Sequence, residues 1–133
     1  MNEKIMVVDD EPGMLALLEI VLRRKGYTVL TAGGAYQALD LLAKEKPDLF
    51  ILDIIMPGIT GLELCRQLRN RPDTAHIPVL MLSGWPDADA AQRGFAAGAD
   101  DYLPKATSHV QIVKRVQALL SRNSGRQRLC NVS

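Results

Sequence analysis

Short apolar runs alternate with longer amphipathic stretches along most of the chain. The short runs predict five strands, at residues 4–9, 28–31, 48–53, 78–82 and 101–103. Three of these runs are nearly continuous in Val, Ile and Leu, which is typical of parallel strands covered on both faces. We therefore expect a buried parallel sheet rather than an antiparallel sheet with one wet face.

The stretches between these runs follow the 3.6-residue period of amphipathic helices. The first has apolar residues at helical spacing from Met14 to Leu22 and should end at Gly26, after three basic residues. Four more helices are predicted at residues 35–46, 61–70, 87–97 and 108–121. Alternating strands and helices indicate an α/β fold with right-handed crossovers, in which functional loops lie at the carboxyl ends of the strands.

The apolar period stops near residue 121. We interpret residues 1–121 as one domain and residues 122–133, "RNSGRQRLCNVS", as a polar, basic tail or the start of a linker. The 133 residues are enough for one ordinary globular domain that buries most of its apolar surface.

Composition excludes several classes of function. Sixteen basic and 15 acidic residues leave a net charge of +1, so no overall field indicates a nucleic acid, a membrane surface or an acidic partner. The first apolar run, residues 5–8, is too short for a signal peptide or a membrane span, so we expect a cytoplasmic protein. The two cysteines, Cys65 and Cys130, have no metal or disulfide spacing and are interpreted as free thiols.

Asp53 lies inside the apolar run "LFILDIIMPG", where an ionised carboxylate is costly without a partner. If the first and third strands are neighbours, Asp9 and Asp10 reach the same crevice, with Glu11 next along the loop. A small cluster of hard oxygen ligands suits Mg²⁺. The alternative is that Asp10 or Glu11 simply caps the first helix ahead of Pro12.

Two further strands carry polar residues at their ends. Ser83 follows "PVLML", and Lys105 follows "DYLP". An Asp, a metal, a hydroxyl and an ammonium together supply what phosphoryl transfer requires: a nucleophile, a bridging cation and donors for the developing charge. A single Ser or Lys after a strand is common and indicates no function by itself. The hypothesis of phosphoryl transfer rests on the occurrence of all these residues at successive strand ends.

Four motifs in order resemble the CheY-like receiver domain of two-component response regulators. They are "VVDDEPG" at residues 7–13, "LDIIMPGITGLEL" at 52–64, "VLMLSGW" at 79–85 and "GADDYLPK" at 98–105. The resemblance covers residues 4–121. It implies a flavodoxin-like, doubly wound sheet of five parallel strands in the order 2-1-3-4-5, with five helices.

The resemblance also implies a role for each matching residue. Asp53 matches the phosphoacceptor, which receives a phosphoryl group from a sensor kinase phosphohistidine or a phosphotransfer protein. Asp10 matches the direct Mg²⁺ ligand, Asp9 the acid that acts through a metal-bound water, and Ile55 the residue whose backbone carbonyl binds the metal. Lys105 matches the ammonium that pairs with the phosphoaspartate.

The implied output is a conformational switch. Ser83 matches the hydroxyl that moves towards the phosphoryl oxygens, and Tyr102 matches the aromatic side chain that swings inward. The surface that changes should be the fourth helix, the last strand and the last helix, which would contact a downstream protein or output domain. A homodimer through the same elements is a further expectation, whereas neither nucleic acid nor membrane contact is expected from this segment. Such a domain is a signalling phosphoacceptor that assists its own phosphorylation and dephosphorylation, not an enzyme with a separate substrate.

The motif around Lys105 departs from the family pattern. Receivers usually have Pro after this Lys, joined by a cis bond, but here Ala106 follows and Pro104 precedes. A cis bond that does not precede Pro costs roughly 2.5–4 kcal/mol, so the Lys105-Ala106 bond is either trans, with a differently shaped loop, or cis at that cost, and the sequence leaves both open. Pro104 fits a last strand at the edge of the sheet.

Two bulky side chains, Ile55 and Trp85, follow Asp53 and Ser83 by two residues. We hypothesise that they slow loss of the phosphoryl group by excluding water. The alternative is that Trp85 only packs its loop.

Two other functions stay open at this stage. One is a receiver-like scaffold that is never phosphorylated. The other is an aspartyl phosphatase, but those enzymes resemble Asp-x-Asp, and here Ile55 takes the second position, so no general acid is available. His76 and His109 have no partner at metal spacing, which favours surface positions over metal ligation.

Overall fold

The sheet is fully parallel, as its apolar runs predicted. The computed structural model describes residues 3–84 and 88–132, with residue 88 and residues 123–132 described through the backbone alone. The strands are β1 (Lys4–Val8), β2 (Thr28–Ala32), β3 (Leu49–Asp53), β4 (Val79–Ser83) and β5 (Asp101–Pro104). Their order is β2-β1-β3-β4-β5, and every neighbouring pair is parallel. The expected flavodoxin-like, doubly wound fold is confirmed.

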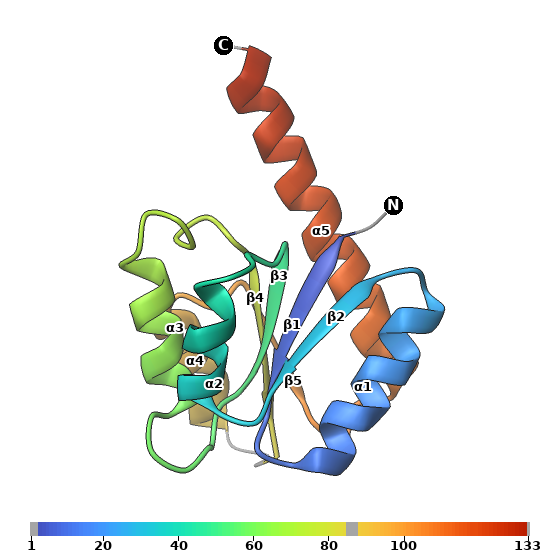
Figure 1. The fold of residues 1–133 in the computed structure, drawn as a ribbon, viewed down its shortest axis with the longest axis vertical. Coiled ribbons are helices and arrows are strands. Elements are labelled where there is room, and N and C mark those ends of the chain that lie inside the picture. Colours follow the sequence, from blue (N-terminus) through green and yellow to red (C-terminus); the bar gives the residue numbers. More distant parts are fainter. Residues whose placement is uncertain (1–2, 85–87, 133) are drawn as a thin grey trace.

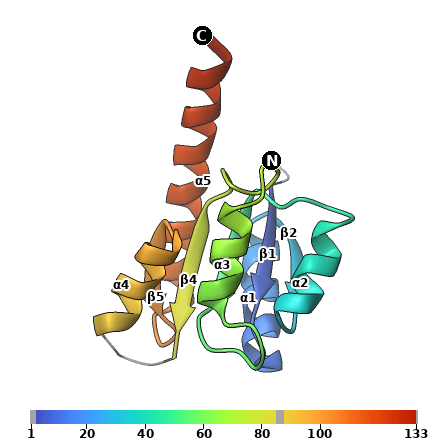
Figure 2. The same cartoon turned by 90° about the vertical axis from the view of Figure 1, so that its left-hand side faces the viewer.

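Helices cover both faces of this sheet. They are α1 (Pro12–Arg24), α2 (Ala35–Leu42), α3 (Gly61–Arg69), α4 (Ala88–Ala97) and α5 (His109–Val132). Figures 1 and 2 show α1 and α5 on one side of the sheet and α2, α3 and α4 on the other. The core is divided in the same way: Leu18 and Leu22 of α1 pack in a cluster with α5, whereas Leu64 and Leu68 of α3 pack in a second cluster with α2 and α4.

Two helix ends differ from the periodicity. The predicted helix at residues 35–46 ends at Leu42, because the backbone N–H groups of Ala43 and Lys44 turn back to carbonyls three residues earlier. The helix predicted to end at residue 121 continues instead to Val132 and extends beyond the body of the fold in Figures 1 and 2. Residues 122–132 have no apolar period, so the pattern of the sequence could not reveal this extension. The division of the chain at residue 121 stays a prediction.

The strand register brings the carboxyl ends of the strands together. Val8 of β1 pairs with Leu52 of β3, so the residues that follow each of them lie side by side. Ser83 and Pro104 pair at the ends of β4 and β5, which places Pro104 on an edge strand, as predicted. The described residues contain no cis peptide bond, so the Lys105-Ala106 bond, which the sequence left open, is trans. No helix among the described residues is long and apolar enough to span a membrane.

Candidate functional site

Three aspartates meet at the carboxyl edge of the sheet. Asp9 and Asp53 are buried, at 2% and 3% exposure, and Asp10 is exposed beside them. One carboxylate oxygen from each lies within 4.8 Å of the others. Three hard oxygen donors this close, with one face open to solvent, fit the ligand preference of Mg²⁺. Among the described residues, this is the one group of such side chains with metal-binding spacing.

Asp53 ends β3 and is held by the loop that follows it. One carboxylate oxygen, Oδ1, accepts a hydrogen bond from the Ile55 backbone N–H at 3.3 Å. The first residue of α3, Gly61, donates its N–H to the Ile54 carbonyl at 2.9 Å, which ties the start of α3 to the end of β3. Thr60 caps this helix by accepting from the N–H of Glu63. The nucleophile candidate is therefore fixed by backbone contacts on a rigid element.

Asp9 is oriented by the turn into α1. Its Oδ1 accepts the N–H of Glu11 at 2.9 Å. Glu11 is the N-cap residue of α1 and Pro12 begins the helix, but the Glu11 side chain makes no capping hydrogen bond. The idea that Glu11 caps the helix with its carboxylate is therefore wrong. This carboxylate lies against Lys105 instead.

Lys105 connects the acidic residues across the edge of the sheet. Its backbone N–H donates to the Ser83 carbonyl at 2.7 Å, which fixes the start of the side chain beside β4. Its Nζ lies 3.0 Å from Asp53 Oδ2, 2.9 Å from Asp9 Oδ2 and 2.6 Å from Glu11 Oε1. The ammonium thus compensates a concentration of negative charge that would otherwise be unfavourable in a largely buried site.

These contacts determine how the site titrates. Burial raises the pKa of Asp53 to about 6 and the charge of Asp9 adds to the shift, while the hydrogen bond from Lys105 opposes it. Burial alone would lower the pKa of Lys105, but its bonds to Glu11, Asp9 and Asp53 outweigh that effect and raise it. At neutral pH Asp53 is therefore mostly an anion beside a firmly protonated ammonium.

The remaining predicted site residues lie around this centre. Ser83, 1% exposed, ends β4 next to Lys105. Tyr102 of β5 is half-buried and packs against the apolar cluster under α3 and α4. The side chain of Ile55 is 50% exposed at the mouth of the site. Trp85 lies outside the described residues, and its role as a water barrier stays a prediction.

The prediction missed two residues of this site. Glu11 was noted as the next acid along the loop and as a possible helix cap, but its contact with a lysine 94 positions away was not predicted, because such a contact has no local signature. Gly61 was placed at the start of a helix without a reason for being glycine. A Gly as the first residue of an amphipathic helix that follows a predicted site strand is a weak signal for close backbone approach.

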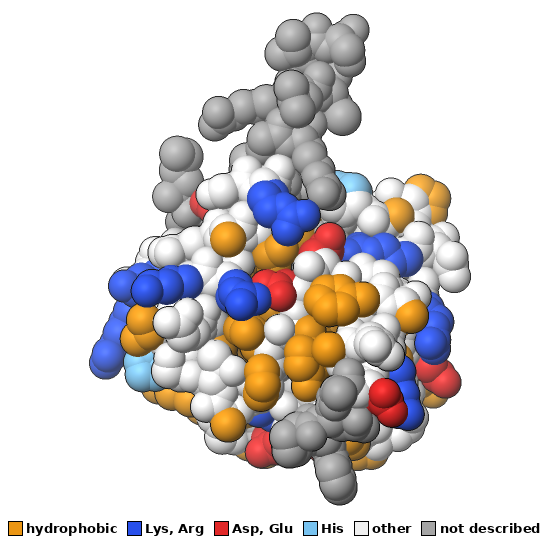
Figure 3. All heavy atoms as spheres, turned by 180° about the vertical axis from the view of Figure 1, so that it is seen from behind, with side chains coloured by type: hydrophobic (Ala, Val, Ile, Leu, Met, Phe, Trp, Pro, Cys, Tyr) orange, Lys and Arg blue, Asp and Glu red, His pale blue; other side chains and the backbone are white. Residues whose placement is uncertain are grey.

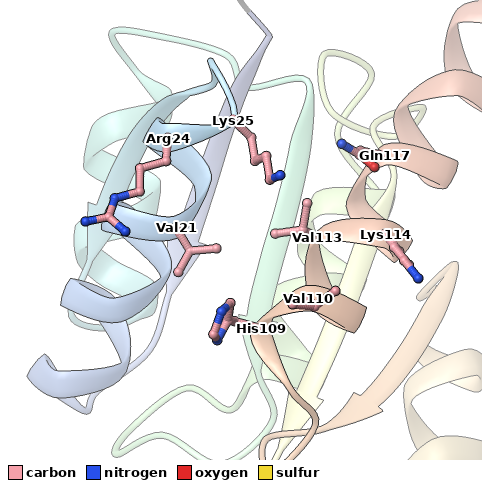
Figure 4. A pocket seen from close by; sticks show the side chains of 8 residues that line it. All are labelled: Val21, Arg24, Lys25, His109, Val110, Val113, Lys114 and Gln117. Carbon is pink, nitrogen blue, oxygen red and sulfur yellow. The ribbon is translucent and has the colours of Figure 1, made fainter.

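A second hollow lies between α1 and α5, with a volume of about 380 Å³. Figure 4 shows residues of the two helices facing one another across it. The groove is lined by valine side chains and by the basic residues Arg24, Lys25, Lys114 and His109, and its lining contains no carboxylate. This groove therefore has no carboxylate ligand for a hard cation. His109 is exposed, so the surface position predicted for it is confirmed.

The face turned away from the viewer in Figure 1 carries α5 and β5. Figure 3 shows hydrophobic side chains gathered on it, with acidic side chains between them and Lys and Arg nearby. Phe95 of α4 and Val110 of α5 are each about half exposed. Arg115 of α5 forms a two-pronged ion pair with Asp101 of β5, at 2.7 and 2.8 Å. The surface of α4, β5 and α5, which is predicted to change on phosphorylation, thus combines exposed apolar side chains with one ion pair between β5 and α5.

Comparison with known proteins agrees with this geometry. The family model of the response regulator receiver domain matches residues 5–117. The chain is 42% identical over 123 residues to the alkaline phosphatase synthesis transcriptional regulatory protein PhoP of Bacillus subtilis, a match that covers 92% of this chain and 50% of PhoP. The chain spans about half the length of the curated relatives it matches.

Solved structures show the same architecture. The receiver domain of a signal transduction histidine kinase from Syntrophus aciditrophicus superposes with a TM-score of 0.83 at 34% identity, covering 90% of each chain. The chemotaxis response regulator CheY4 of Vibrio cholerae superposes with a TM-score of 0.84 at 29% identity, covering 90% of this chain and 99% of that one.

Proposed function

Because the chain belongs to the response regulator receiver family, we propose that it accepts a phosphoryl group on Asp53 from a phosphohistidine of a sensor kinase or phosphotransfer protein. The observation that carries the proposal is the contact between Lys105 Nζ and Asp53 Oδ2 at 3.0 Å, beside the cluster that Asp9 and Asp10 form with Asp53. A nucleophile, a cation site and an ammonium in one crevice are the parts that phosphoryl transfer uses. The family resemblance supports a cytoplasmic location for this exchange.

The transfer requires little chemistry from the protein. A carboxylate oxygen of Asp53 supplies the electron pair for a new P–O bond as the P–N bond to the donor imidazole breaks. The electron pair of the broken bond stays on the imidazole nitrogen, and a solvent proton keeps the released imidazole neutral. Since the pKa of Asp53 is about 6, this carboxylate is ionised and nucleophilic in most molecules of the protein at pH 7. The Lys105 ammonium balances the charge that gathers on the phosphoryl oxygens.

The carboxylate cluster would hold Mg²⁺. Asp10 and Asp53 would bind it directly, with the backbone carbonyl of Ile55, and Asp9 would act through a water. When bound, the ion supplies a positive charge that neutralises phosphoryl oxygens. The exposure of Asp10 beside two buried carboxylates supports this assignment, because Mg²⁺ in proteins usually keeps several waters.

Phosphorylation would act as a switch through Ser83 and Tyr102. The new oxygens offer strong acceptors to the Ser83 hydroxyl and the Lys105 ammonium, which favours the conformation that makes both bonds. Tyr102, half-buried on β5, would move further inward and change the surface of α4, β5 and α5. The apolar patch and the Asp101–Arg115 pair on that surface suit a downstream protein, an output domain or a second copy of the chain. The net charge of +1 gives this segment no overall attraction for nucleic acid.

The two rival functions fit the site less well. An aspartyl phosphatase needs a general acid near its nucleophile, and the second position after Asp53 is the apolar Ile55. An unphosphorylated scaffold would not need a buried carboxylate whose pKa is raised by burial, because such a group costs stability.

Intact mass after incubation with Mg²⁺ and acetyl phosphate tests the proposal, with Asp53→Asn as the matched control. We expect a gain of one phosphoryl group in the wild type that requires Mg²⁺ and is absent from the control. A folded wild-type protein that gains nothing would overturn the proposal and favour the scaffold. An equal gain in Asp53→Asn would place the acceptor elsewhere.

A further inference from the structure

We propose that Glu11 is a positioning residue that holds the Lys105 ammonium in the resting protein and releases it when Asp53 is phosphorylated. The inference rests on the proposed phosphoacceptor function and adds a residue to it. Its basis is that the Glu11 carboxylate, although mostly exposed, makes the shortest contact of Lys105.

The contacts of Lys105 use all of its hydrogen-bonding capacity. An ammonium has three N–H donors and no acceptor. Lys105 Nζ has three carboxylate partners, Asp9 at 2.9 Å, Asp53 at 3.0 Å and Glu11 at 2.6 Å. A phosphoryl oxygen on Asp53 can take over the N–H that the Asp53 carboxylate now accepts, but a second phosphoryl contact with Lys105 must replace Asp9 or Glu11.

Burial decides which partner leaves. The Asp9 side chain is 2% exposed and also accepts the Glu11 N–H, so moving it would leave a charge without water or a partner. Asp53 carries the phosphoryl group and keeps one contact with Lys105 through a phosphoryl oxygen, so a second contact has to come from Asp9 or Glu11. The Glu11 side chain is 64% exposed, and its carboxylate becomes hydrated at little cost once it turns away. Glu11 is thus the partner that the phosphoryl group displaces.

The resting contact has a consequence for the rate of phosphorylation. While the Glu11 carboxylate binds the Lys105 ammonium, the third N–H cannot bind an incoming phosphoryl oxygen. Lys105 therefore stabilises the negative charge on the phosphoryl group only in part until this contact breaks. Removing the carboxylate should speed acceptance of the phosphoryl group by about two- to five-fold, the range expected for one partly exposed ion pair.

The test compares Glu11→Gln with Glu19→Gln under saturating Mg²⁺, with acetyl phosphate as the donor and intact mass as the readout. Glu19 lies on α1, where it pairs with Arg23, so its variant removes the same charge from the same helix away from the site. We expect Glu11→Gln to be phosphorylated faster and Glu19→Gln to match the wild type. Equal rates in the three proteins, or a slower Glu11→Gln, would overturn the inference.

A second condition separates release of Lys105 from a general field effect. At 1 M salt the screening length is about 3 Å, so a long-range effect on an anionic donor disappears. We expect the advantage of Glu11→Gln to persist there, and its loss would assign the effect to the field and overturn the inference. Urea unfolding of both variants completes the test, since a merely structural ion pair would change stability and leave the rate unaltered. If the wild type itself gains no phosphoryl group, the proposed function fails, not the role of Glu11 alone.

Discussion

The backbone of Gly61 lies against the backbone of Asp53. A Cβ atom built on Gly61 would be 2.0 Å from the Asp53 carbonyl oxygen and 2.8 Å from its carbonyl carbon. The Gly61 N–H donates to the neighbouring Ile54 carbonyl at 2.9 Å. The start of α3 can therefore approach the end of β3 only because residue 61 has no side chain, and this approach sets the position of the phosphoacceptor candidate.

Gly61→Ala should consequently destabilise the protein and disturb the site. The obstructing atoms belong to the backbone and cannot rotate away, so α3 or the end of β3 must shift, at a cost of about 1–3 kcal/mol. Urea unfolding should show this loss, and phosphorylation by acetyl phosphate should slow as Asp53 moves. Gly13→Ala is the control, because a Cβ at that helical position meets nothing within 4 Å and should leave stability unchanged or slightly higher. Equal stability of the two variants would contradict the packing argument.

Asp53→Asn should stabilise the metal-free protein in a pH-dependent way. Burial, with a contribution from Asp9, raises the pKa of Asp53 from its ordinary 3.8 to about 6, against the opposing bond from Lys105. The folded protein thus holds this proton more tightly than the unfolded chain. The stability that Asp53 contributes is fully present below pH 3.8 and is lost as the pH rises through about 6. A shift of about two units corresponds to roughly 3 kcal/mol at most.

Urea unfolding in EDTA at pH 5 and pH 8 measures this difference. The free energy of unfolding of Asp53→Asn should exceed that of the wild type by more at pH 8 than at pH 5. Added Mg²⁺ should then reduce this difference, because it stabilises only the wild type. Asp40→Asn, which removes an exposed acid from α2, should show no comparable pH dependence. A gain for Asp53→Asn that is constant between the two pH values would contradict the assigned cause.

A second network, at the opposite end of β4, should depend on the shape of the Arg69 side chain. Arg69 donates through Nε to the Gly98 carbonyl at 2.9 Å, through Nη1 to the Ile77 carbonyl at 2.6 Å and through Nη2 to Asp100 at 2.7 Å. The same Asp100 oxygen accepts the N–H of Val79 at 2.9 Å, so the network joins α3, β4 and the turn before β5.

Arg69→Lys should therefore destabilise the fold by about 1–3 kcal/mol although the charge is kept. A single ammonium cannot reach three acceptors that a planar guanidinium meets in a fixed geometry, and the partners left behind are partly buried. Chemical denaturation measures the loss, and Arg23→Lys in the exposed pair with Glu19 is the control, with an expected change near zero. If both replacements proved equally mild, the network would be shown to be redundant.

The parts of the site that the sequence predicted are those that sheet topology imposes. Once the apolar runs indicate parallel strands, the residues after them must share one edge, which brings Asp9, Asp10, Asp53, Ser83 and Lys105 together. The contact of Glu11 with Lys105 and the approach of Gly61 to Asp53 depend on side-chain paths and loop geometry that no local pattern encodes. The extension of α5 to Val132 was not predicted, because residues 122–133 carry no apolar period that would indicate a helix.

Ile55→Gln should shorten the lifetime of the phosphorylated state. The Ile55 side chain is 50% exposed two residues after Asp53, while its backbone N–H binds the Asp53 carboxylate and would remain in the variant. An apolar side chain at the mouth of the site hinders the approach of water to the phosphoryl group, whereas an amide can hold water there. Decay of the phosphorylated mass after removal of the donor measures the lifetime. Ile20→Gln on α1 is the control, since Ile20 is 52% exposed and belongs to no part of the site. The barrier hypothesis fails if both variants lose the phosphoryl group at the wild-type rate. It also fails if only Ile20→Gln loses the group faster, because the lifetime would then depend on α1 and not on the side chain of Ile55.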